Sequence, residues 1–216
     1  MKSAAAAAGR DPRQVTLLAV SKTHPAALVE QALAAGQRAF GENYVQEALE
    51  KMDAVPGAEW HLIGPLQSNK TRVVAARFDW VHSVENEKIA RRLSEQRPQG
   101  MPALNVLIQV NVSGEASKSG VAPSQTEAMA RSVSSMPRLK LRGLMAIPEP
   151  GADAARYREL KSLYESLKSQ FHCDTLSVGM SEDMATAIAE GATMVRIGTA
   201  IFGARAKDKP VVRPPA

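Results

Sequence analysis

The chain has 216 residues, 44% hydrophobic and 23% charged, which is enough for one substantial core and too little for two ordinary domains. Its formal net charge is +5, but only 4% of its residues are aromatic, so stacking platforms for single-stranded nucleic acid are scarce and we expect no nucleic-acid partner. Cys173 is the only cysteine, and no apolar run reaches the ~18 residues of a membrane span. We therefore expect a reduced, cytoplasmic protein without a disulfide or a membrane partner.

Residues 1–14 are expected to form a short helix and a loop. The alanine run at 4–8 is typical of a helix, and Gly9 with Pro12 beyond it indicates where that helix ends. We divide the rest of the chain into a folded domain, 15–205, and a loose tail, 206–216, because residues 210–216 contain three prolines.

Residues 15–22 (VTLLAVSK) predict a buried strand that ends in an amine. The run is mostly apolar or β-branched, Pro25 blocks its continuation, and a helical pattern follows at 25–35. This order is typical of a parallel strand feeding a helix, which would place Lys22 where strand–helix enzymes keep their chemistry. Burial lowers the pKa of an ammonium, so a partly neutral Lys22 could attack a carbonyl. On this strand alone, a surface lysine that merely closes the strand is the more common alternative.

The same strand–helix pattern recurs along the chain. Further strands are expected at 39–45, 60–64, 80–84, 104–112, 141–147, 175–178 and 194–197. The helices between them are expected at 46–52, 68–77, 87–96, 124–135, 154–171 and 182–190, with a short closing helix at the end. About eight such units predict an α/β fold, a single (β/α)8 TIM barrel, and an open doubly wound sheet is the alternative.

Two loops late in the chain offer groups that fit a phosphate. After the seventh strand, Ser181 is expected to be an N-cap hydroxyl. After the eighth strand, Gly198 permits close backbone approach beside the Thr199 hydroxyl and the free amides of a helix start. A capping serine and a strand-ending glycine are the structural alternatives, but barrels of this kind commonly bind phosphate in these two loops. Arg196 shares the orientation of Gly198 on its strand, so it would enter the barrel mouth and need a carboxylate or a ligand as partner.

The histidines do not have the spacing of a zinc site, so we expect no metal. They are His24, His61, His82 and His172. His61 and His82 are expected to be hydrogen-bonded core residues, with a pocket wall as the less common alternative. Met145 and Met180 are expected to serve packing.

Several ordered blocks resemble the pyridoxal phosphate homeostasis protein family, single-domain barrels similar to the N-terminal domain of alanine racemase. The blocks are 19–23 (AVSKT), 40–47 (FGENYVQE), 60–70 (WHLIGPLQSNK), 110–120 (VNVSGEASKSG), 143–147 (GLMAI), 177–183 (SVGMSED) and 196–203 (RIGTAIFG). Family members usually begin with a longer helix, so closure of the barrel base is expected to suffer here.

The resemblance implies that the cofactor is pyridoxal 5′-phosphate (PLP) and assigns roles to six residues. Lys22 would form a Schiff base with the aldehyde, Asn43 would lie beside the ring, Ser181, Gly198 and Thr199 would hold the phosphate, and Arg196 would face the pyridine nitrogen. A cationic donor there disfavours protonation of the nitrogen, which makes the ring a weaker electron sink than one paired with a carboxylate.

We therefore expect a monomeric PLP-binding protein of intracellular PLP homeostasis that buffers PLP or delivers it to apo PLP-dependent enzymes. No dedicated catalysis is expected, although a residual racemase-type activity stays open. The alternative is a single-domain PLP-dependent amino-acid racemase, which needs a second acid/base. In racemases of this fold a tyrosine from an added β domain supplies it, and none of Tyr44, Tyr157 and Tyr164 is an obvious substitute. A third possibility is a phosphate-recognising scaffold that forms no covalent bond.

Overall fold

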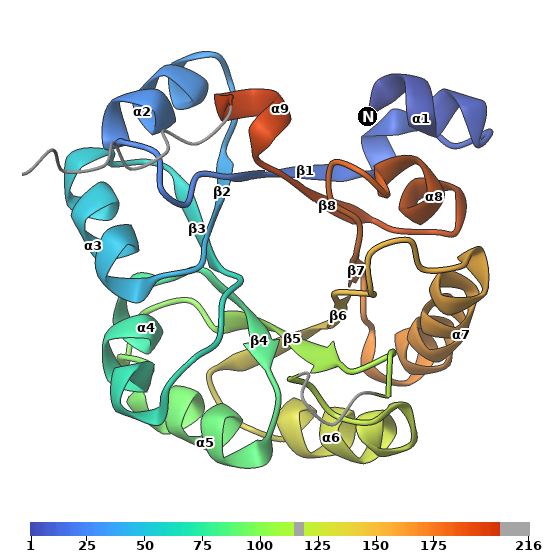
Figure 1. The fold of residues 1–216 in the computed structure, drawn as a ribbon. Coiled ribbons are helices and arrows are strands. Elements are labelled where there is room, and N and C mark those ends of the chain that lie inside the picture. The colour runs from blue at the N-terminus through green and yellow to red at the C-terminus, as the bar shows by residue number, and fades with distance from the viewer. Residues whose placement is uncertain (115–118, 204–216) are drawn as a thin grey trace, which may run out of the picture.

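Eight parallel strands close into a barrel whose strand order follows the sequence (Figure 1). The computed structural model describes residues 1–114 and 119–203, so the predicted tail of 206–216 lies outside the described residues. The strands are β1 (Thr16–Val20), β2 (Ala39–Glu42), β3 (Glu59–Leu62), β4 (Trp80–Val84), β5 (Leu104–Val110), β6 (Leu139–Ala146), β7 (Thr175–Ser177) and β8 (Met194–Ile197). The barrel closes because β1 pairs with β8 as well as with β2.

Helices surround the barrel on the outside (Figure 1). They are α1 (Lys2–Ala7), α2 (Ala26–Ala34), α3 (Val45–Ala54), α4 (Thr71–Arg77), α5 (Glu87–Gln96), α6 (Thr126–Ser134), α7 (Ala154–Phe171), α8 (Met184–Ala189) and α9 (Thr199–Phe202). Three short 3-10 turns are η1 (Pro12–Gln14), η2 (Ser68–Lys70) and η3 (Pro123–Gln125). The predicted order of strands and helices is confirmed, and the open doubly wound sheet is wrong.

Side chains alternate between the barrel interior and the helix layer, as period-two strands require. The largest buried cluster lies between the strands and the helices. Leu18 forms a separate small cluster with Ala39 and Met194, on the interior side. Met145 is fully buried in another such cluster, so its expected packing role is confirmed. On β1 the residues before and after Leu18 therefore face the helices, and Lys22, four positions on, shares the inward direction of Leu18.

Closure of the barrel base does not suffer from the short first helix, so that expectation is wrong. The helix α1 packs beside α8, next to the junction of β1 and β8 (Figure 1). Arg10, just after α1, donates hydrogen bonds of 2.7 Å to the carbonyls of Ile188, in the last turn of α8, and of Ala192, just beyond that helix. A cation at a helix C-terminus satisfies its last carbonyls, so a helix of one or two turns is sufficient to anchor the chain there.

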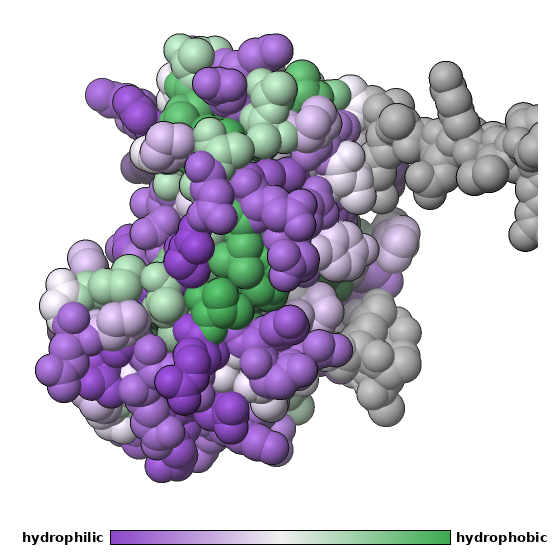
Figure 2. All heavy atoms as spheres, turned by 90° about the vertical axis from the view of Figure 1, so that its left-hand side faces the viewer, coloured by the Kyte–Doolittle hydropathy of each residue, from purple (hydrophilic) through white to green (hydrophobic). Residues whose placement is uncertain are grey.

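The side of the molecule on which α2, α3 and α4 lie is mainly hydrophilic (Figure 2). Figure 2 shows the side on which α2, α3 and α4 lie, where hydrophilic residues cover most of the surface around a small apolar hollow. The interspersed charges of the sequence are therefore largely solvated helix surface. Within 1–114 and 119–203, no helix combines the length and the apolar character needed to cross a bilayer.

Candidate functional site

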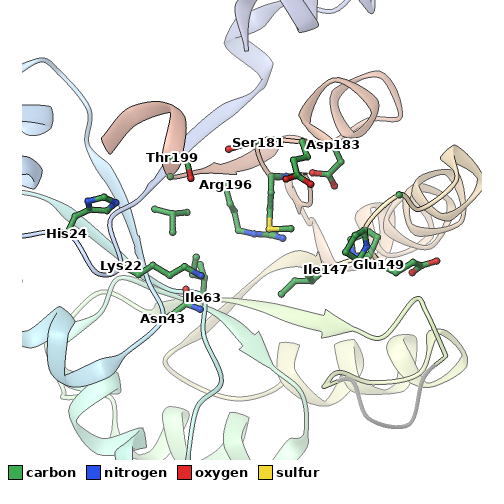
Figure 3. A pocket seen from close by; sticks show the side chains of 17 residues that line it. Lys22, His24, Asn43, Ile63, Ile147, Glu149, Ser181, Asp183, Arg196 and Thr199 are labelled. Carbon is green, nitrogen blue, oxygen red and sulfur yellow. Dashed lines mark hydrogen bonds between the residues drawn. The ribbon is translucent and has the colours of Figure 1, made fainter. Parts of the chain in front are cut away.

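A cavity of about 390 Å³ opens at the carboxyl ends of the strands, where barrels of this fold keep their active sites. Segments that follow β1, β2, β6, β7 and β8 contribute to its wall. All six residues named from the sequence line it, namely Lys22, Asn43, Ser181, Arg196, Gly198 and Thr199. In Figure 3, Ser181 and Thr199 lie on one side of the cavity, Lys22 and Asn43 lie on the other, and the guanidinium of Arg196 points between them.

Asn43 presents an unsatisfied polar atom at this site. Its Oδ1 is buried and has no hydrogen-bond partner within the described part of the chain. Gly64, after β3, lies against the Asn43 backbone so closely that a Cβ at position 64 would clash with the Asn43 carbonyl. Gly64 therefore allows the end of β2 to sit where Asn43 enters the cavity wall. A buried amide oxygen without a partner is costly, which favours a ligand donor as its missing partner.

Arg196 is buried at the floor of the cavity, and oxygens of the protein accept hydrogen bonds from both of its terminal nitrogens. Nη1 donates to the Ser177 carbonyl at 2.8 Å and to the Ser177 hydroxyl at 3.0 Å, and Nη2 donates to the Ala146 carbonyl at 2.9 Å. Arg196 was expected to need a carboxylate or a ligand as partner, and in the structure these carbonyl and hydroxyl oxygens stand where a carboxylate partner would. Burial lowers the pKa of Arg196 to about 10, with the Asp183 charge opposing the shift, so the guanidinium stays protonated at neutral pH.

A buried chain of polar groups continues from Arg196 toward the opposite end of the barrel. His82 Nδ1 lies 3.3 Å from the Ser177 hydroxyl, and His82 Nε2 lies 2.9 Å from His61 Nδ1. His61 Nε2 lies 2.8 Å from a carboxylate oxygen of Glu59, at the start of β3. Both histidines are fully buried and hydrogen-bonded, as the core interpretation predicts, and neither lines the cavity.

This histidine pair should make stability fall in mild acid. Burial holds the pKa of His82 well below its usual value, with the nearby His61 and Arg196 adding to the shift, and burial also lowers the pKa of His61. In the unfolded chain, His82 binds a proton near the normal histidine pKa, whereas in the folded protein it stays neutral at that pH. Its contribution to the free energy of unfolding is therefore present above the normal pKa and is lost as the pH falls below it. Between pH 7.5 and 5.5, we expect a fall in the free energy of unfolding of about 1 kcal/mol from His82 alone.

Urea unfolding of His82→Asn at these two pH values tests this expectation. The variant should lose less stability than the wild type on acidification. The matched control is His172→Asn, because His172 is exposed and has a left-handed φ of 54° that asparagine tolerates. An identical pH dependence in the His82 variant and the wild type would contradict the assignment.

The turn after β7 differs in detail from the prediction. Ser181 is not the N-cap of α8, because that helix begins at Met184 with Asp183 as its N-cap. The Asp183 carboxylate accepts hydrogen bonds of 2.6 Å from the Met180 amide and from the Tyr157 hydroxyl, which tie the turn to α7. Ser181 is thereby left exposed on the cavity wall instead of being used by a helix.

After β8, some of the backbone amides expected to be free are already hydrogen-bonded. The amides of Ile201 and Phe202 donate to the Gly198 carbonyl, so an anion would have to be bound by the amides of residues 198–200. Gly198 has an ordinary negative φ of −115°. A Cβ on it would come within 3.0 Å of the Val20 carbonyl, so this glycine also allows β8 to approach β1.

Several residues that line the cavity were not predicted from the sequence. His24 is nearly buried and packs against Phe202 with ring centroids 5.3 Å apart, and its position two residues after Lys22 was the available signal. The loop 147–151 after β6 forms much of one wall, although its proline-rich sequence suggests only a turn. Met180 lines the cavity and is 44% exposed, so its expected role in packing is wrong.

Nowhere in the described chain do three or more His, Cys, Asp or Glu side chains form a group that could hold a metal.

The chain matches known proteins over nearly its whole length. A family model described as alanine racemase, N-terminal domain, matches residues 2–206. The pyridoxal phosphate homeostasis protein of Pseudomonas aeruginosa is 61% identical over 209 residues, which are 95% of this chain and 91% of that protein. The chain belongs to the pyridoxal phosphate homeostasis protein family. The family member of Escherichia coli strain K12 is 53% identical over 219 residues, with 97% of this chain and 94% of that protein covered.

Solved structures agree with this assignment. The structure of PipY from Synechococcus elongatus with PLP bound is 38% identical, has a TM-score of 0.80, and covers 92% of this chain and 97% of that chain. Alanine racemase from Corynebacterium glutamicum is 20% identical with a TM-score of 0.72, and the match covers 98% of this chain but 60% of the racemase. At that identity the second likeness shows the fold alone, and it confirms the predicted racemase-like barrel.

Proposed function

We propose that this member of the pyridoxal phosphate homeostasis protein family binds PLP as a Schiff base on Lys22 and buffers or delivers it in the cytoplasm, without a dedicated reaction. The observation on which this rests is the meeting of an amine, a buried guanidinium and two hydroxyls in one cavity. The PLP seen in the related PipY structure supports the choice of cofactor.

The lining residues fit the chemical groups of PLP. Ser181 and Thr199 offer hydroxyls on the side of the cavity away from Lys22 (Figure 3). Gly198, the residue before Thr199, offers close approach to its backbone. Phosphate oxygens accept hydrogen bonds from such groups. The Lys22 amine would attack the aldehyde carbon, a C=N bond would form, and the carbonyl oxygen would leave as water. The orphaned Oδ1 of Asn43 would gain a partner at the rim of the ring.

The charge of Arg196 favours a protein that binds the cofactor over one that uses it in catalysis. Bound PLP supplies an electron sink when its pyridine nitrogen is protonated. Arg196 remains cationic, since its pKa of about 10 lies well above neutral pH, and a cation at that nitrogen disfavours its protonation. We therefore propose that this chain keeps PLP in a form that reacts weakly with amino acids.

The arrangement of tyrosines does not favour a racemase. A racemase needs an acid/base on each face of the substrate α-carbon. No tyrosine belongs to the cavity wall formed by the described residues. Tyr157 and Tyr164 are buried residues of α7, and the Tyr157 hydroxyl donates a hydrogen bond to Asp183. Tyr44 is 59% exposed.

Two assays test the proposed role. First, the PLP-loaded protein is mixed with an apo PLP-dependent enzyme, with and without a scavenger of free aldehyde. We expect the apo enzyme to regain activity, and failure to do so without the scavenger would contradict delivery. Second, several amino acids are assayed for racemisation in the presence of PLP. Sustained turnover that Lys22→Ala abolishes would overturn the proposal and favour the racemase.

A further inference from the structure

Lys51, on α3, is a buried ammonium that lies behind the end of β1. Its side chain is 5% exposed. Nζ donates hydrogen bonds to the Ser21 carbonyl at 2.6 Å, to Glu42 Oε1 at 2.6 Å and to Glu47 Oε1 at 2.7 Å. An ammonium has three donors, so these three oxygens satisfy it completely. A buried ion pair contributes little net stability, so such a set of contacts is better explained by the geometry that it fixes.

The acceptors of Lys51 hold the backbone on both sides of Lys22. The Ser21 carbonyl is bound directly by Lys51, and the Ser21 hydroxyl donates to Glu42 Oε1 at 2.6 Å. Glu47 Oε1 accepts the Thr23 amide at 2.5 Å. The residues that precede and follow Lys22 are therefore both tied to one cluster, which we define as Glu42, Glu47 and Lys51.

Thr23 adopts a backbone conformation that needs such support. Its φ is +65°, a left-handed value that a β-branched residue rarely adopts. Strained residues of this kind persist where the surrounding contacts determine them, and they gather at functional sites. Side chains alternate along β1, so Ser21 faces the cluster while Lys22 faces the cavity. The strained turn thus lies between the cluster and the amine.

The cluster does not touch the cavity. None of its three members belongs to the cavity wall. The wall residues that adjoin the cluster along the chain are Lys22, in the turn 21–23, and Asn43, which follows Glu42. Of these two segments, Lys51 and Glu47 contact the turn, through the Ser21 carbonyl and the Thr23 amide. Glu42 is fully buried, and its Oε2 has no hydrogen-bond partner among the described residues. Burial raises the pKa of Glu42, and the hydrogen bonds from Lys51 and Ser21 oppose that shift.

We propose that Glu42, Glu47 and Lys51 are positioning residues that clamp the turn 21–23 and thereby aim the Lys22 amine at an aldehyde held in the cavity. This inference rests on the proposed function, because it assigns the clamp to the same adduct. A clamp of this kind sets how fast the C=N bond forms and leaves the phosphate side of the cavity unaffected.

Two probes separate these effects in Lys51→Met. The first is PLP, followed by the rate of adduct formation on Lys22 after borohydride trapping. The second is 4-deoxypyridoxine 5′-phosphate, which has the ring and the phosphate but no aldehyde. We expect the adduct rate to fall by about tenfold or more, because misplacement of a reacting group by about 1 Å has effects of this size. The affinity for the second probe should stay within about twofold.

A rescue experiment distinguishes positioning from a general structural role. Glycine adopts a positive φ without strain, so Thr23→Gly added to Lys51→Met should restore much of the adduct rate. Glu47→Ala is a milder variant that should fold, since the Glu47 side chain is 25% exposed, and it should slow the adduct in the same direction. Glu50→Ala is the control, because Glu50 is exposed on the same helix.

The outcomes are distinct. Normal adduct rates in Lys51→Met and Glu47→Ala would refute the clamp while leaving the proposed function intact. An equal loss of both probes in Lys51→Met, with no rescue by Thr23→Gly, would also refute it. Absence of any Lys22 adduct in the wild type would refute the proposed function itself.

Discussion

Replacing Lys22 with alanine is expected to abolish the Schiff-base band in the visible absorption of bound PLP. In the wild type, the proposed C=N bond between Lys22 and the cofactor would give the chromophore, and borohydride would reduce it to a stable secondary amine. Alanine removes the only lysine on the cavity wall formed by the described residues. The residues on the opposite side that are proposed to bind the phosphate should still hold PLP non-covalently. We expect this affinity to be at least about tenfold lower than that of the wild type, equivalent to about 1.4 kcal/mol.

Absorbance spectra and equilibrium dialysis measure the two parts of this prediction. The control is Lys168→Ala, because Lys168 is half exposed on α7 and does not belong to the cavity wall. It should bind PLP as the wild type does. A visible band of normal intensity in Lys22→Ala would mean that another amine holds the cofactor.

Replacing Arg196 with leucine should destabilise the fold as well as the cofactor site. The change removes the donors to the carbonyls of Ala146 and Ser177, at the ends of β6 and β7. A buried carbonyl left without a partner costs about 1–3 kcal/mol, so we expect a loss of about 3 kcal/mol in the free energy of unfolding. Arg196→Lys should recover only part of this loss, because an ammonium lacks the planar fork of a guanidinium.

Urea unfolding at neutral pH measures the loss, and Arg158→Leu is the matched control. Arg158 forms an ion pair with Glu190 on the surface, where such pairs contribute at most about 1 kcal/mol. The Arg196 variants should also show a changed pH dependence of the PLP spectrum, because the cation beside the ring is lost or moved. Equal stability of Arg196→Leu and Arg158→Leu would show that the barrel does not depend on this guanidinium.

The barrel itself could be predicted from the sequence because its signals are local. Each strand is a short apolar run, and proline or glycine indicates where the next helix begins and ends. Pro25 precedes α2, and Gly36 follows it. The positions of Lys22, Arg196 and Thr199 follow from the predicted strand ends, since all carboxyl ends of a parallel barrel meet at one face. Asn43 was expected within a strand, and only the resemblance to the family assigned it to the site.

What the sequence could not predict depends on contacts between distant residues. The sequence predicts Ser181 as the N-cap of α8, but the helix starts later, with Asp183 as its N-cap, and Asp183 contacts Tyr157 on another helix. His61 and His82 are 21 residues apart on neighbouring strands, and no periodicity indicates that their rings meet. The same holds for Lys51, which looks like an ordinary helix-surface lysine until α3 packs behind β1.

A crystal structure with PLP would show whether Lys22 holds the cofactor. We expect continuous density from Lys22 Nζ to the ring, with the phosphate against Ser181, Gly198 and Thr199 and the pyridine nitrogen toward Arg196. Density for the ring elsewhere, with the Lys22 side chain turned out of the cavity, would contradict this expectation.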